Sequence, residues 1–105
     1  MVQVTLSEHN DYIIIEIKGH CSSGDENTSE MSHRKICSCV TLIACTIKAI
    51  CDNKNDLCNL SSGYLYCEYK KEVDYSVDVL GIEALILELY ILQKYYPNHI
   101  KIETR

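Results

Sequence analysis

The chain begins with two runs in which apolar and polar side chains alternate. Val2, Val4 and Leu6 have polar neighbours, and the alternation returns over residues 13–17 after the turn-like sequence Glu-His-Asn-Asp. Successive side chains of a strand point to opposite faces of a sheet, so each run would have one buried and one exposed face. We predict a hairpin of two strands over residues 2–18.

A helical period replaces this alternation after a polar segment at residues 22–32. Apolar residues then recur at steps of three and four positions, which places them on one face of a helix. They are Ile36, Val40, Ile43, Ile47 and Ile50. We predict a core helix from about Ser32 to Asp52.

The rest of the chain predicts a strand, a second helix and a final strand. Residues 53–63 are rich in turn-forming side chains, and residues 64–69 alternate as a strand with one buried side would. Pro97 ends the second helix, and residues 100–102 alternate again. The predicted core residues of the second helix are Leu80, Ala84, Leu87 and Ile91.

The predicted order of elements is therefore β-β-α-β-α-β. Both helices exceed the roughly ten residues that a crossover between parallel strands needs. They can lie together on one face of a four-stranded mixed sheet, which makes residues 1–105 a single, two-layer α+β domain.

The second predicted helix is apolar on more than one side. Besides its predicted core residues it carries a further apolar set, Ile82, Leu85, Ile86, Leu89 and Leu92. A two-layer monomer covers only one face of such a helix, so another subunit could cover the rest. We predict a homodimer; the alternative is a helix that lies deeper in its own core.

Composition and charge narrow the range of functions. The net charge is −5, and the ten Lys and Arg residues form no basic stripe, which argues against nucleic acid as a direct partner. No opening segment has the features of an export signal, and charges interrupt the most apolar stretch, residues 79–96. We expect a cytoplasmic protein without a membrane partner, whose seven cysteines are free thiols.

A histidine and a cysteine flank the polar segment at positions that suit nucleophilic catalysis. His20 follows Gly19 just beyond a predicted strand, and Cys37 lies in the opening turns of the first predicted helix. The N–H groups of a helix start and the nearby Arg34 and Lys35 would favour the thiolate. The histidine could accept the thiol proton and later protonate a leaving amine.

The residues alone leave other interpretations open. In a chain with seven cysteines and four histidines such a pair can arise by accident, and Cys37 could be a structural thiol. A metal site could use His33 and Cys37, with His20 and Cys21 as further ligands from across the loop, but no C-x-x-C is present and we predict neither metal nor cofactor. The cysteines predicted to be structural are Cys39, Cys45, Cys51, Cys58 and Cys67, the last buried in a strand.

The residues around the histidine and the cysteine also form a longer pattern. Gly19-His20 is followed by a polar loop and then by Ile36-Cys37-Ser38-Cys39-Val40-Thr41 at the start of a helix. This resembles the Prp family of ribosomal-processing cysteine proteases, whose pattern is Gly-His-Ala, a loop and Asp-Ile-Val-Cys-Ala-Ala-Val-Ser. The resemblance extends over nearly the whole chain. It implies a homodimeric α+β peptidase that removes the N-terminal extension of a large-subunit ribosomal protein, with His20 as the catalytic histidine and Cys37 as the nucleophile.

Some positions depart from the family pattern. Cys21 replaces an alanine, the loop is longer, and Arg34 stands where the family has an aspartate three residues before the cysteine. We take Gly19, Arg34, Ser38 and Thr41 as supporting or substrate-binding positions, and the polar loop as a lid that could close over a peptide. The alternative function is a catalytically silent or diverged dimeric peptide-binding paralogue on the same fold.

Overall fold

The computed structural model describes residues 1–19, 31–71 and 77–105, with the side chains of all of these except residues 31–33 and 77. Two helices and five strands follow one another along these described residues. They are β1 (Val2–His9), β2 (Tyr12–Lys18), α1 (Met31–Lys54), β3 (Leu57–Ser61), β4 (Tyr64–Lys70), α2 (Val77–Tyr95) and β5 (Ile100–Thr104).

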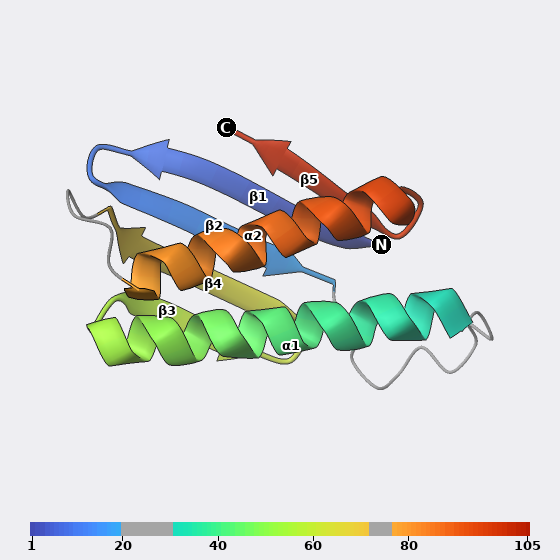
Figure 1. Ribbon diagram of the computed structural model, residues 1–105, viewed down its shortest axis with the longest axis horizontal. Coiled ribbons are helices and arrows are strands. Elements are labelled where there is room, and N and C mark those ends of the chain that lie inside the picture. Colours follow the sequence, from blue (N-terminus) through green and yellow to red (C-terminus); the bar gives the residue numbers. More distant parts are fainter. Residues whose placement is uncertain (20–30, 72–76) are drawn as a thin grey trace.

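The strands form one mixed sheet in the order β3-β4-β2-β1-β5. β1 and β5 are parallel, whereas the other neighbouring strands are antiparallel. Both helices lie on one face of this sheet, with α1 over the side of β3 and β4 and α2 toward β5 (Figure 1). The predicted two-layer α+β class is therefore confirmed.

The predicted N-terminal hairpin is confirmed. Val4 lies opposite Ile17 and Leu6 opposite Ile15, and all four side chains are buried on the helix-covered face. Asn10 makes the tight turn between the strands with a φ of 52°, a conformation that asparagine tolerates better than most residues.

The sheet has five strands where the sequence predicts four. Residues predicted as turns contain β3, which pairs with β4 at the edge of the sheet. Only Cys58 of this short strand is buried, so its alternation is weak. Residues with positive φ, Asn55 and Gly63, lie on either side of it, and these turn-forming residues hide the strand in the sequence.

The core face of α2 is also different from the prediction. Leu80, Leu87 and Ile91 are exposed, and so is Ala84. The core instead receives the residues assigned to the outer side, namely Ile82 and Leu89, with Leu85, Ile86 and Leu92 partly buried against it. A helix that is apolar all round gives no periodic signal that could choose between these faces.

The predicted face of α1 is confirmed. Ile36, Val40, Ile43 and Ile47 are buried, and Ile50 is packed against the core. By length and hydropathy alone the segment Arg34–Lys54 would also pass as a membrane span. In this fold its apolar stripe packs on the sheet instead, as expected of a core helix.

Candidate active site

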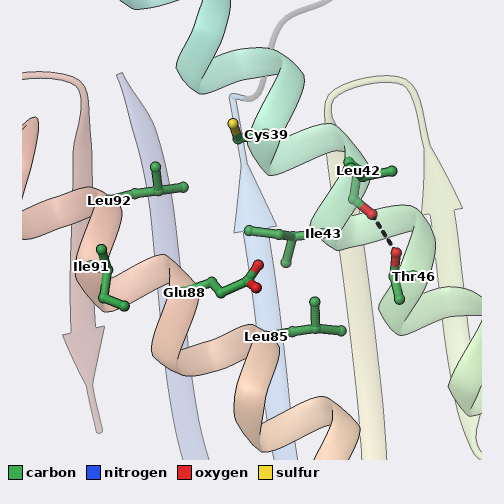
Figure 2. A pocket seen from close by; sticks show the side chains of 8 residues that line it. All are labelled: Cys39, Leu42, Ile43, Thr46, Leu85, Glu88, Ile91 and Leu92. Carbon is green, nitrogen blue, oxygen red and sulfur yellow. Dashed lines mark hydrogen bonds between the residues drawn. The ribbon is translucent and has the colours of Figure 1, made fainter.

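Of the site predicted from the sequence, the structure describes Gly19 after the end of β2 and Cys37 in α1. Figures 1 and 2 both show β2 running toward the N-terminal half of α1. Gly19 follows β2 with a φ of +79°, and its N–H donates to the carbonyl oxygen of Gly63 at 3.0 Å. A Cβ at this position would lie 2.8 Å from the backbone oxygen of Met1, so only glycine fits without a shift.

Part of the predicted site lies outside the described residues. This applies to His20, to Cys21 and to the proposed lid, and the side chain of His33 is not described either. The predicted Cys-His pair and the alternative metal site therefore remain predictions.

Cys37 is buried in the second turn of α1, with only 3% of its surface exposed. It lies beyond the first four N–H groups of the helix, which are the ones without an intrahelical partner. In this structure its sulfur is disulfide-bonded, so the prediction of free thiols is wrong for Cys37. It holds for the other described cysteines, which are free. Sequence spacing could not reveal the bond because it depends on which thiols meet in space.

Three of the four supporting positions lie near Cys37 on α1. Arg34 and Thr41 lie about one turn before and after it, hence on the same side of the helix. Arg34 and Ser38 are exposed, whereas Thr41 is half-buried. The arrangement therefore places a cation and hydroxyl groups around a buried sulfur.

An apolar groove runs between α1 and α2 beside this position. Its first part, about 470 Å³, lies near Arg34, Ile36 and Ser38, and Tyr96 of the opposite wall follows the end of α2. Its second part, about 450 Å³, continues along the helices (Figure 2). Cys39 and Leu92 line both parts, and we call the whole the inter-helix groove.

Two of the cysteines predicted to be structural are at the surface. Cys39 and Cys45 are exposed on α1, so the assignment of both as packing residues is wrong. The helical period gives the reason for Cys45, which lies on the opposite side of α1 from the stripe that begins at Ile36. Cys39, three residues after Ile36, lies at the edge of that stripe and lines the inter-helix groove.

The other three cysteines are buried as predicted, and the structure brings them together. Cys58 lies opposite Cys67 in the ladder of β3 and β4, and Cys51 Sγ of α1 lies 2.8 Å from Cys67 Sγ. The hydrogen bond with Cys67 lowers the pKa of Cys51, and burial raises the pKa of Cys58 to about 11. Sequence reasoning missed this cluster because it missed β3.

The outer face of the sheet is polar. Tyr64 Oη of β4 donates to Glu16 Oε2 of β2 at 2.7 Å, and Lys18 Nζ lies 3.3 Å from Glu16 Oε1. The hydrogen bond from Tyr64 is the main cause that lowers the pKa of the Glu16 carboxyl. This pair lies on the side of the sheet away from the helices and does not contribute to the groove.

No family model matches the chain, and no curated protein matches it by sequence. Solved structures nevertheless share its fold. SMU.848 from Streptococcus mutans has a TM-score of 0.71 at 18% identity, over 99% of this chain and 96% of that one.

The ribosomal processing protease Prp from S. aureus has the same fold over the full length of both chains. Its complex with a covalently linked product peptide gives a TM-score of 0.68 at 12% identity, and its complex with a substrate peptide gives 0.67 at 15%. At these identities the likeness shows a shared fold, with two helices on a mixed five-stranded sheet.

Proposed function

We propose that this chain is a cysteine endopeptidase that removes the N-terminal extension of a large-subunit ribosomal protein in the cytoplasm. The observation that carries the proposal is a full-length fold shared with a ribosomal processing protease, in a chain with Gly-His after β2 and a cysteine in α1. Fold alone does not fix function, so the residues around the predicted site have to supply the chemistry.

In the proposed reaction Cys37 is the nucleophile and His20 is the base. The thiolate attacks the scissile carbonyl carbon, and the histidine, which has taken the thiol proton, protonates the leaving amine as the C–N bond breaks. Water, deprotonated by the same histidine, then hydrolyses the thioester and releases the thiol. The guanidinium of Arg34, about one turn before Cys37, favours the thiolate.

This reaction requires the reduced form of Cys37. A disulfide-bonded sulfur carries no thiolate, so the form described above would be inactive until a thiol reductant opens the bond. Peptide cleavage should therefore depend on reductant and stop when the reductant is removed under oxidising conditions.

The inter-helix groove is the proposed peptide-binding surface. Ile36 and Ser38, which flank the nucleophile, line its first part, and its lining is mainly apolar. An extended peptide with apolar side chains could lie there with its scissile bond near Cys37. Ser38, Arg34 and Thr41 are the side chains proposed to hold or position it, and Gly19 fixes the direction in which the chain leaves β2.

The proposed enzyme is a homodimer. The outer side of α2 exposes Leu80, Leu87 and Ile91, and Tyr95 is 70% exposed at the end of the helix. Such an apolar face is unfavourable in water and a second copy of the chain would cover it.

Cleavage of a ribosomal-protein extension peptide tests the proposal. We expect reduced wild-type protein to cleave it, and Cys37→Ala and His20→Ala to lose at least about a thousandfold in rate. Cys45→Ala, which removes an exposed thiol from the same helix at a position that does not line the groove, is the matched control and should keep the rate. Cleavage that survives Cys37→Ala would refute the assignment of the nucleophile.

A second function is favoured by the disulfide of Cys37 and by Arg34 in place of the family's aspartate. On this alternative the chain is a catalytically silent, dimeric peptide-binding paralogue. Fluorescence anisotropy with the same labelled peptides separates the two functions. Saturable binding without product from any reduced form would support the silent paralogue, whereas product formation would exclude it.

A further inference from the structure

Three buried thiols from three elements meet in the core, away from the proposed peptidase site. Cys51 lies near the end of α1, Cys58 on β3 and Cys67 on β4. Their sulfur atoms all lie within 4.8 Å of one another. Cys51 is fourteen residues beyond Cys37 on the same helix, which is about 21 Å along its axis.

The backbone holds these thiols in place from two sides. Cys58 and Cys67 are directly opposite in the antiparallel ladder, so their side chains point to the same face of the sheet. The N–H of Asp56 donates to the carbonyl oxygen of Cys51 at 2.9 Å, and Lys48 Nζ donates to the carbonyl oxygen of Cys58 at 3.0 Å. The end of α1 is thereby fixed against β3.

The donor set selects the kind of metal that could bind. Among the described residues this group consists of sulfur donors only, without an imidazole or carboxylate member. Ca²⁺ and Mg²⁺ require oxygen ligands, and a closed Zn²⁺ site takes four ligands. Three thiolates in a dry site suit a soft, low-coordinate monovalent ion, which among the biological metals is Cu(I).

We propose that Cys51, Cys58 and Cys67 bind one Cu(I) ion in a three-coordinate site between α1 and the β3–β4 hairpin. Sulfurs about 2.3 Å from a central ion would be roughly 4 Å apart, which the observed limit of 4.8 Å allows. Cys51 Sγ and Cys67 Sγ, now 2.8 Å apart, must separate by roughly 1 Å, which small side-chain rotations can supply.

A charged pair lies beside the site, and the edge strand gives access to it. Bound Cu(I) with more than one thiolate leaves net negative charge, which the nearby Asp56 carboxylate disfavours and the Lys54 ammonium favours. This ammonium is buried and lies 3.1 Å from Asp56 Oδ2, although neither atom makes a well-aligned hydrogen bond. Cys58 lies on the edge strand and is 6% exposed, so the ion could enter there by exchange from a small thiol complex.

Competition for Cu(I) tests the proposal without any measurement of peptidase activity. The full chain is reduced, kept free of oxygen and titrated with Cu(I) held by a coloured chelator such as bicinchoninate. A background variant with Cys21→Ser, Cys37→Ala, Cys39→Ser and Cys45→Ser keeps only the three clustered thiols. We expect it to withdraw one Cu(I) per chain, with three sulfur neighbours by X-ray absorption spectroscopy.

Loss of one ligand is the sharper part of the test. Cys58→Ala should weaken Cu(I) binding by more than about a hundredfold, because even the loss of an outer-shell partner costs roughly 10–100-fold. Leu60→Ala is the matched control, since it also reduces packing of β3 but keeps the thiols, and it should stay within about threefold of the parent. Urea unfolding checks that both variants are folded, and Cys51→Ala replaces Cys58→Ala if the latter is not.

Several results would overturn the proposal. They are a background variant that folds but withdraws no Cu(I), a folded Cys58→Ala that binds as tightly as its parent, and a Cys51–Cys67 disulfide in protein kept under reductant. If the background variant does not fold, the same comparison is made with Cys58→Ala in the wild-type chain. There, too, an unchanged amount of tightly bound Cu(I) would refute the site.

Discussion

At the scale of single residues, the backbone conformation at the end of β2 limits which amino acid fits there, and side-chain chemistry matters less. Gly19 has a φ of +79° and touches the backbone of Met1, so any side chain there meets both conformational strain and a clash. Gly81, in the second turn of α2, is different: an added Cβ would meet only the end of the Ile50 side chain, at 3.3 Å. The two glycines therefore make a matched pair.

Gly19→Ala should lower the free energy of unfolding by about 1–3 kcal/mol, because a non-glycine residue would be strained in this conformation. Gly81→Ala should leave it unchanged or raise it by up to about 1 kcal/mol, since alanine favours a helix and the Ile50 side chain can yield. Urea unfolding at neutral pH measures both. Equal effects of the same sign would contradict this account of Gly19.

The hydrogen bond between Tyr64 and Glu16 predicts a specific pH dependence. It lowers the pKa of Glu16 below its ordinary value of 4.5, so it stabilises the fold above that value and the contribution is lost as pH falls through the folded-state pKa. The same bond raises the pKa of Tyr64 above its ordinary value of 10, so the hydroxyl, which is protonated at neutral pH in any case, remains a donor to higher pH.

Tyr64→Phe should therefore lower the urea midpoint slightly at neutral pH and have little effect at the lowest pH at which the wild type still folds. Glu16→Gln should reduce the same pH dependence. In the double variant the losses caused by the two substitutions should not add, because each substitution removes the same hydrogen bond. Additive losses would show that the bond does not carry the effect.

At the scale of elements, the sequence predicts those helices and strands whose pattern of apolar and polar residues has a clear period. The hairpin of β1 and β2 and the stripe of α1 have a single clear period, and both were predictable. β3 was not, because it is short, lies at an edge and has turn residues on either side. Because β3 was missed, neither the pairing of Cys58 with Cys67 nor the thiol cluster could be predicted.

The core face of α2 was unpredictable for the opposite reason, an excess of apolar residues. Leu89→Ala should cost about 2–5 kcal/mol of unfolding free energy, because the residue is fully buried and truncation leaves a cavity. Leu87→Ala, two positions away and 62% exposed, should cost about 0.5 kcal/mol or less in the monomer. Chemical unfolding at low protein concentration compares the two variants. A larger loss of unfolding free energy in Leu87→Ala than in Leu89→Ala would support the core face that the sequence predicts for α2.

At the scale of the whole molecule, the exposed side of α2 determines how the chain associates. Leu80→Glu together with Leu87→Glu, at exposed positions of α2 that do not line the groove, should convert the proposed dimer into a monomer, because charges placed in an apolar interface would be buried without partners. Asn59→Glu, which adds a charge at an exposed position of β3, should leave association unchanged. Sedimentation velocity over a range of concentrations measures all three proteins.

A wild-type chain that stays monomeric at every concentration tested would exclude the dimer and leave the α2 face for some other partner. Peptide cleavage should not depend on dimerisation, unless the inter-helix groove is complete only when a second copy is present. Comparing cleavage rates of the wild type and the double glutamate variant distinguishes those cases.

The parallel pairing of β1 with β5 has a consequence for how the chain folds during synthesis. Val2 pairs with Ile100, so strands from opposite ends of the described sequence are neighbours in the finished sheet. The hairpin of β1 and β2 is synthesised well before β5, so the β1 edge stays open until the residues of β5 have also been made. Emergence of β5, rather than formation of the hairpin, would then set the moment at which the native sheet closes.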